Sequence, residues 1–327
     1  MPYSGIYVSN SVNLPWQQGS TPLILAPMQG LTNRAVRDYF IETVQPDTLF
    51  TEFMQVNAAA EKRRLTPVDR RDIASGSGEF PVVVQLVGHG REPLVAAAIE
   101  AQELGARHIN LNMGCPYGRM TSGLTGGGMM KRPELLPDII RPLRDAVNCS
   151  FSIKIRAGYD DPQQILSLLP LFESAGVDFI ALHPRTVVQE YKGAADHSVT
   201  AAVVRNCKIP IIANGDIRTS EDAERVLKGT GAAGLMLGRG AIADPLLFSR
   251  IRGKAEKSPV AETMTREAKG YLLAISGRYR EIFCGDMQVL GKLKAIVSQM
   301  DDAMLGKILK ELKRAKSLAA FEAVLSR

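Results

Sequence analysis

Long hydrophobic runs are missing from this 327-residue sequence. No stretch approaches the roughly 20 apolar residues that cross a bilayer as a helix. A secretory signal is missing as well, because the first basic residue is Arg34 and no apolar segment follows Met1. The sequence therefore predicts a cytoplasmic protein without a membrane partner.

Cysteine is scarce, with four residues at positions 115, 149, 207 and 284. No two of them form the closely spaced pair of a zinc motif, and their low share excludes a disulfide scaffold. In a reducing compartment they are expected to be free thiols. These absences predict that the protein binds no metal.

Composition is otherwise that of an ordinary globular protein, with 45% hydrophobic and 23% charged residues, and it excludes disorder, collagen and coiled coil. The net charge of +6 is unevenly distributed. Residues 250–327 hold 16 Lys and Arg against 9 Asp and Glu, whereas residues 1–249 hold 24 against 25. Such asymmetry indicates either a solvated helical face or a segment that binds a polyanion, with nucleic acid as the first candidate.

Short apolar runs bounded by turn residues alternate with helix-like stretches. These runs predict strands at 23–27, 48–53, 81–87, 108–112, 151–156, 178–183, 210–214 and 234–238. Helices are expected between them, including 92–104, 133–147, 162–175 and 220–228. Eight strands alternating with helices predict parallel βαβ units, arranged either as a (βα)8 barrel or as a doubly wound sheet.

Polar residues at the ends of the predicted strands favour the barrel. Active sites of barrels form at the carboxyl-terminal rim, where such residues converge. The residues in question are Gln85, Asn112, Lys154, Arg156, His183, Arg185 and Asn214. The first strand is not followed by the G-x-G-x-x-G of a dinucleotide-binding sheet. We therefore predict an α/β protein built on a (βα)8 TIM barrel.

The pattern changes near residue 260 to helices without strands. Stretches 261–283, 286–299 and 303–327 carry apolar residues at helical spacing and Lys or Arg on their other faces. With the charge surplus, they predict a catalytic barrel domain over residues 1–250 and a small all-helical domain over residues 251–327.

Two reactive side chains lie near the predicted rim. Cys115 follows the fourth strand in the segment Asn112-Met113-Gly114-Cys115-Pro116, at a catalytic rather than a core position. Lys154 lies in the middle of the fifth strand, where an inward-pointing amine needs an anion or a strong acceptor. The alternatives are an inert, buried Cys and an outward, solvated Lys.

Two glycine-containing segments predict a phosphate site. Asn214-Gly215-Asp216 ends the seventh strand and Gly238-Arg239-Gly240 ends the eighth. Barrels often bind phosphate with the loops after these two strands. Glycine lets backbone N–H groups approach the oxygens, and Arg239 supplies a fork of donors. The two segments together therefore indicate a phosphorylated ligand.

From Leu25 onward the chain resembles the flavin-dependent tRNA-dihydrouridine synthases of bacterial type. Each motif is weak alone, but the set in this order is specific. In chain order, the motifs are Ala26-Pro27-Met28, Thr51-Glu52-Phe53, Val84-Gln85-Leu86, residues 110–116, residues 154–160, His183-Pro184-Arg185-Thr186, residues 209–217 and Gly238-Arg239-Gly240.

The resemblance implies an FMN-binding barrel followed by a helical tRNA-binding domain, with NADPH or NADH as reductant. Lys154 would meet the flavin near its N1–C2 edge, and Cys115 would be the catalytic acid. The implied cofactor-binding residues are Pro27, Met28, Gln85, Lys154, His183, Asn214, Gly215, Asp216, Gly238 and Arg239. We expect the chain to act as a monomer.

The implied reaction reduces uridine in tRNA to 5,6-dihydrouridine, with hydride from flavin N5 to C6 and a proton from Cys115 to C5. We expect Asn112, Arg185 and Tyr191 to contact the substrate. A stacked base cannot reach the flavin, so the target is flipped out or taken from a loop. Sequence-independent phosphate contacts would come from Lys292, Lys294, Lys307, Lys310, Lys313 and Arg314.

Two alternative functions are compatible with parts of the sequence. One is an FMN barrel oxidoreductase that acts on a small molecule, which leaves the basic helices unexplained. The other is a non-catalytic RNA-binding module, which leaves Cys115, Lys154 and Arg239 unexplained.

Overall fold

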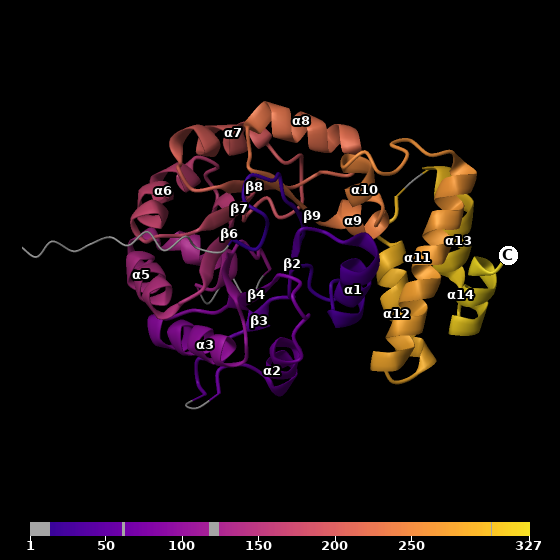
Figure 1. The fold of residues 1–327 in the computed structure, drawn as a ribbon, viewed down its shortest axis with the longest axis horizontal. Helices are drawn as coiled ribbons and strands as arrows, with labels where there is room; N and C mark the ends of the chain where they lie inside the picture. The colour runs from indigo at the N-terminus through magenta and orange to yellow at the C-terminus, as the bar shows by residue number, and fades with distance from the viewer. Residues whose placement is uncertain (1–13, 61–62, 118–123, 302) are drawn as a thin grey trace, which may run out of the picture.

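The computed structural model describes residues 14–60, 63–117, 124–301 and 303–327. Within these ranges, eight parallel strands close into a barrel with helices on its outside (Figure 1). The barrel strands are β1 (Leu23–Leu25), β2 (Thr48–Phe50), β4 (Val82–Val87), β5 (His108–Met113), β6 (Ser150–Gly158), β7 (Phe179–Thr186), β8 (Ile211–Asn214) and β9 (Gly234–Leu237). The predicted (βα)8 TIM barrel is confirmed.

The strand β1 closes the barrel because it pairs with both β2 and the last strand, β9. Ile24 lies opposite Thr48 on one side and Met236 on the other. A two-residue strand, β3 (Met54–Gln55), pairs with β4 beyond the end of β2.

The strand β7 extends further than the predicted 178–183. It continues through Pro184 to Thr186, which pairs with Gly158 of β6. Arg185 therefore lies within the strand and not, as predicted, on the loop after it.

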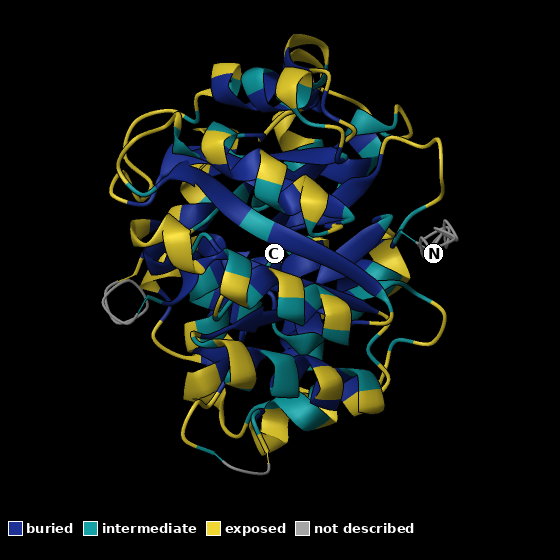
Figure 2. Cartoon of the chain, turned by 90° about the vertical axis from the view of Figure 1, so that its left-hand side faces the viewer, coloured by how far each residue is buried: buried dark blue, intermediate teal, exposed yellow. Residues whose placement is uncertain are grey.

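Helices cover the outside of the barrel. Those preceding the C-terminal segment are α1 (Arg34–Tyr39), α2 (Pro67–Ala74), α3 (Arg91–Glu103), α5 (Pro137–Ala146), α6 (Gln164–Ser174), α7 (His197–Asn206), α8 (Ser220–Thr230), α9 (Arg239–Ala243) and α10 (Leu247–Ile251). Of these helices, α1, α9 and α10 have no exposed residue. On the side of the molecule that Figure 2 shows, exposed residues lie on the outer turns of the helices and buried residues on the strands beneath. This is the amphipathic pattern expected of helices that face a core on one side.

The interior of the barrel is apolar at the amino-terminal end of the strands. Ile24, Phe50, Val83 and Ile212 are buried together there. Trp16, just before β1, packs its ring edge-on against Phe179 with 4.8 Å between centroids. Polar side chains are thereby concentrated at the opposite, carboxyl-terminal end.

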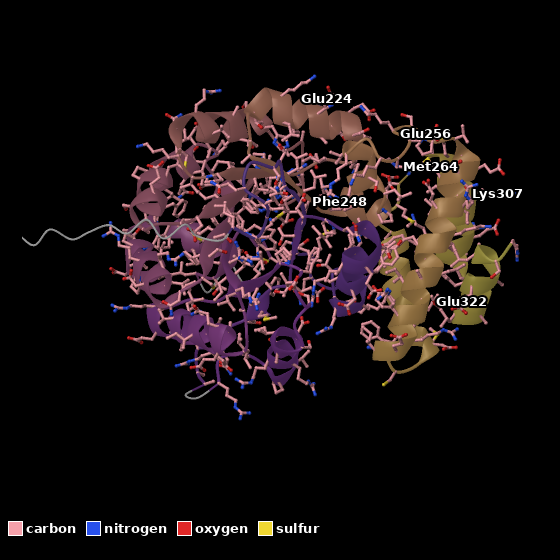
Figure 3. All side chains as sticks on the ribbon, in the orientation of Figure 1. Glu224, Phe248, Glu256, Met264, Lys307 and Glu322 are labelled. Atoms are coloured by element: carbon pink, nitrogen blue, oxygen red, sulfur yellow. The ribbon has the colours of Figure 1, made fainter. Side chains whose placement is uncertain are left out.

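The C-terminal segment is helical, as predicted. It contains α11 (Ala261–Ile282), α12 (Asp286–Val297), α13 (Gly306–Arg314) and α14 (Leu318–Leu325). These helices lie on one side of the barrel beside α1 (Figure 1). The ring centroids of Tyr39 and Tyr271 are 5.2 Å apart. Phe248, labelled in Figure 3 near this junction, packs against Phe40 with 6.1 Å between their ring centroids.

The predicted third C-terminal helix, 303–327, is wrong as a single element. The α-helix breaks after Arg314, and Ser317 starts α14 by accepting the N–H of Ala320 at 3.1 Å. Serine competes for backbone hydrogen bonds and therefore favours such a cap over a helix interior. Among the helices of the described ranges, none combines the length and apolarity that a bilayer span requires.

Candidate active site

A cavity of about 550 Å³ opens at the carboxyl ends of the barrel strands. Every predicted site residue except Arg185 contributes to its wall: Pro27, Met28, Gln85, Asn112, Cys115, Lys154, His183, Tyr191, Asn214, Gly215, Asp216, Gly238 and Arg239. Strand ends and loops that are more than 200 residues apart in the chain are thus brought together, as the rim of a barrel allows.

A larger cavity, of about 820 Å³, lies near the other end of the strands, beside Leu14 and His108. It contains no predicted site residue, and two of the arginines that line it, Arg37 and Arg144, are paired with Asp72 and Asp178. The convergence of chemical groups therefore selects the smaller cavity as the candidate site.

A chain of buried amides forms one wall of the site. Asn112 Nδ2 donates to Gln85 Oε1 at 2.9 Å, and Gln85 Nε2 donates to Asn110 Oδ1 at 2.8 Å. Asn110 Nδ2 donates in turn to Ser152 Oγ at 2.8 Å. Because buried amides are costly without partners, this chain fixes the orientation of Gln85 and Asn112.

Cys115 lies half-buried on the loop after β5, held from two sides. Asn112 Oδ1 accepts the backbone N–H groups of Gly114 and Cys115, both at 3.0 Å. The Gly127 N–H donates to the Cys115 carbonyl at 3.0 Å. A Cβ on Gly127 would lie 2.8 Å from that oxygen, so the glycine is required for the close approach.

Lys154 is a half-buried cation in the barrel interior. Its Nζ donates to Asn214 Oδ1 at 3.1 Å. Burial, and then the neighbouring Arg156, lowers the pKa of Lys154 to about 8. An amine in this setting is stabilised by a ligand that offers it further acceptors.

His183 is a neutral imidazole beside the cavity. Burial, followed by the charges of Lys154 and Arg156, lowers the pKa of His183 well below its ordinary value. Its Nε2 lies 3.0 Å from Arg185 Nη1, and an arginine only donates, so the ring proton is on Nδ1. A Cβ on Gly215 would lie 2.9 Å from this ring. The φ of Gly215, +123°, also requires glycine.

Asp216 joins two guanidinium groups at the same end of the cavity. Its carboxylate lies 2.6 Å from Arg185 Nη2 and 3.1 Å from Arg239 Nη2, and it accepts the Ala195 N–H at 2.8 Å. Burial raises the pKa of Asp216, but the hydrogen bonds from Arg185 and Ala195 outweigh it, so the pKa is lowered overall. Asp216 is therefore an anion that orients Arg239.

Arg185 is held away from the cavity. Its side chain is only 2% exposed, and besides Asp216 and His183 it donates to the Gly193 carbonyl at 2.5 Å. These bonds tie β7 to the loop that carries Tyr191.

Arg156 was expected at the rim of the barrel, but the sequence assigned it no functional role. It lines the cavity, and its guanidinium carbon is 5.3 Å from the centre of the Tyr191 ring. Its Nε donates to the Gly114 carbonyl at 2.9 Å, next to Cys115. A signal for it exists in the sequence, since residues two apart on a strand face the same side and Lys154 is expected to point inward.

Gln299 is a residue of the cavity wall that the sequence did not place near the site. It follows α12, yet it lines the cavity, so the helical segment contributes to the wall of the site. Lys292 of the same helix donates to the Gly30 carbonyl at 3.4 Å. No local sequence pattern predicts such a long-range contact.

The cavity suits a flat heteroaromatic cofactor with an anionic tail. Ala26, Met28 and Met236 supply apolar surface to the wall. Gln85 and Lys154 supply polar groups, and Arg239, which is bonded to Asp216, lines the same cavity as Asn214 and Gly215. Among the described residues, no group of three or more His, Cys, Asp or Glu could hold a metal ion.

Comparison with known proteins adds independent information. The family model described as "Dihydrouridine synthase (Dus)" matches residues 24–319. The chain is 35% identical to a "Probable tRNA-dihydrouridine synthase" of Rhodobacter capsulatus, covering 72% of this chain and 73% of the relative. It is 36% identical to the tRNA-dihydrouridine synthase B of Vibrio cholerae, covering 70% of each chain. It is also 36% identical to the tRNA-dihydrouridine(16) synthase of Haemophilus influenzae, covering 72% and 78%.

Proposed function

The chain belongs to the dihydrouridine synthase family, and from this premise we propose that it reduces uridines of tRNA to 5,6-dihydrouridine. The observation that carries the proposal is one cavity that unites Cys115, Lys154 and Arg239 with Gln299 of the basic helical segment. A small-molecule oxidoreductase would not need the last of these.

FMN is the proposed cofactor, with NADPH, or NADH, as the reductant. A flavin bound here would supply the hydride for reduction of the uracil at C6. The apolar surface of Pro27 and Met28 would support the ring, with Gln85 and Lys154 at its polar edge. His183, Asn214, Gly215, Gly238 and Arg239 would hold the ribityl chain and phosphate. Asp216 acts indirectly, since its carboxylate contacts guanidinium groups and would repel a phosphate.

Cys115 is the proposed general acid, donating its thiol proton to C5 of the uracil. Its backbone is bonded to Asn112 and Gly127, which fixes the position of the Cys115 backbone relative to the cavity. General acids act efficiently when held within hydrogen-bond reach of the atom they protonate. Lys154 contributes a positive charge inside the barrel, which stabilises negative charge that develops during the reduction.

Substrate contacts are proposed for Asn112, Arg156 and Tyr191, which share the cavity wall next to Cys115. Arg156 takes the place that the sequence analysis gave to Arg185. We assign Arg185 a positioning function, because it does not line the cavity and its two terminal nitrogens, Nη1 and Nη2, are engaged by Asp216, His183 and Gly193.

The helical segment is the proposed tRNA-binding domain, with the division near residue 250 retained as part of the proposal. Gln299 brings it to the active-site cavity, whereas Lys307 lies on its far side from the barrel (Figure 3). A long polyanion that crosses both surfaces would meet the basic side chains and place one base at the cavity. A single chain supplies both surfaces, so we propose a monomer.

The proposal is tested by incubating the purified protein with NADPH and unmodified tRNA, then digesting the RNA and weighing its nucleosides. We expect a uridine that is heavier by two hydrogens. A yellow protein that oxidises NADPH but leaves all tRNA unchanged would indicate the small-molecule oxidoreductase. A protein that binds tRNA without flavin would indicate the RNA-binding module.

A further inference from the structure

Two exposed aromatic side chains lie together at the mouth of the cavity. Among the described Phe, Tyr and Trp residues, only Tyr117 and Tyr191 are exposed, by 57% and 45%. Tyr117 comes from the loop after β5 and Tyr191 from the loop after β7. Both line the cavity. Exposed aromatic rings carry a cost in water, so their pairing at this place points to a binding surface.

The two rings contact each other directly. Their centroids are 6.3 Å apart and their planes are inclined by 36°. This distance is within the range of a direct aromatic pair, about 4.5 to 7 Å, so a further ring binds on an outer face and not between them. Tyr191 is also flanked by Arg156 and Arg239, at 5.3 and 5.2 Å from its centre. Tyr117 is the more exposed of the two rings. The two arginines lie over the ring of Tyr191 and not over that of Tyr117.

The charges around the pair favour a nucleic acid over an apolar protein surface. Arg156 is a buried cation beside the Tyr191 ring, and Arg239, which is about one-third exposed, shares its charge with Asp216. A ligand that combines planar rings with negative charge matches this setting. Single-stranded RNA has both, and its bases stack on aromatic side chains without regard to sequence.

We propose that Tyr117 is a substrate-binding residue that stacks on the base next to the target uridine. This inference rests on the proposed function. When the target leaves its stack, the neighbouring base loses one stacking partner. A ring at the cavity mouth, two residues after Cys115, replaces that partner. Tyr117 thereby stabilises the open form of the RNA, while the cavity itself receives the target.

The test compares Tyr117→Phe with Tyr117→Leu in the full-length, flavin-loaded protein. Stacking of one base on an aromatic ring changes affinity by roughly 5- to 150-fold. We expect Tyr117→Leu to raise the Kd for tRNA about tenfold, and Tyr117→Phe to leave it within about twofold. Val68→Ala, an exposed apolar change on α2, is the control for general loss of apolar surface. The salt dependence of binding stays the same in all variants, because no phosphate contact is lost.

A spectroscopic signature separates stacking from a structural effect of the substitution. The fluorescent base 2-aminopurine, which is quenched when stacked, is placed on either side of the mapped uridine. With wild type and Tyr117→Phe, the bound probe on one side is expected to stay quenched, whereas with Tyr117→Leu it brightens. Equal affinity and equal quenching for Tyr117→Leu and wild type overturn the inference. A wild-type protein that binds tRNA but forms no dihydrouridine overturns the proposed function instead, and the inference with it.

Discussion

At the scale of single residues, the position of Cys115 gives the most direct prediction. Cys115→Ala removes the proposed proton donor but leaves the proposed flavin-binding groups and the proposed RNA-binding surface in place. We expect dihydrouridine formation to fall about 10²- to 10⁴-fold, the usual contribution of a general acid. Flavin and tRNA binding are expected to change little. Cys284→Ala, at an exposed cysteine outside the cavity, is the matched control. Unchanged turnover in Cys115→Ala would contradict the assignment.

Lys154 predicts a pH dependence of stability in the flavin-free protein. Its pKa is about 8 when folded and 10.5 in the reference state. Between these values the unfolded chain holds a proton that the folded chain has released, so stability rises with pH from about 8 to 10.5. The gain is roughly 1.4 kcal/mol for each unit of pKa shift.

Chemical denaturation at several pH values measures this slope. In Lys154→Met the slope from this residue is expected to disappear. A slope that is identical in wild type and Lys154→Met would show that Lys154 keeps its proton over this range.

At the scale of secondary-structure elements, Asp216 connects the end of β8 to Arg185 of β7 and to Arg239 of α9. Asp216→Asn leaves the buried Arg185 without its anion and Arg239 without its orienting partner, which destabilises the rim. We expect the Kd for FMN to rise about tenfold and the melting temperature to fall, as measured by flavin fluorescence and calorimetry. Tighter FMN binding would mean that Asp216 acts mainly by repelling phosphate.

The secondary-structure elements also show how much of the fold local sequence patterns predict. The eight barrel strands were predictable because apolar runs and turn residues are local features of the chain. The break between α13 and α14 was missed because the apolar spacing continues through it, while the Ser317 cap competes with the helix. The length of β7 was missed because proline usually ends a strand, yet here β7 passes through Pro184.

At the scale of the whole molecule, the charge surplus of residues 250–327 predicts salt-dependent binding. Replacing the exposed Lys307, Lys310, Lys313 and Arg314 by Gln is expected to weaken tRNA binding. The slope of log K against log salt should fall by about 0.7 to 0.9 for each lost phosphate contact. Filter binding at several salt concentrations measures this. Lys208→Gln with Lys228→Gln, exposed on the barrel, is the control. An unchanged slope would place the RNA elsewhere.

The sequence by itself determined the barrel and most residues of the candidate site. Strand pattern and short motifs are local, and in a parallel barrel all strand ends point to one rim, so residues at strand ends must converge there. On this basis the positions of Cys115, Lys154 and Arg239 in the sequence are enough to group them at one site.

Only the tertiary structure decided which side chains reach the cavity. Arg185 and Arg156 both lie on inward positions of neighbouring strands. The ion pair with Asp216 holds Arg185 outside the cavity wall, whereas Arg156 lines the cavity. The presence of Gln299 in the cavity wall and the contact between the rings of Tyr117 and Tyr191 likewise depend on how distant segments pack. These outcomes follow from side-chain direction and competition for partners in three dimensions, which no local pattern encodes.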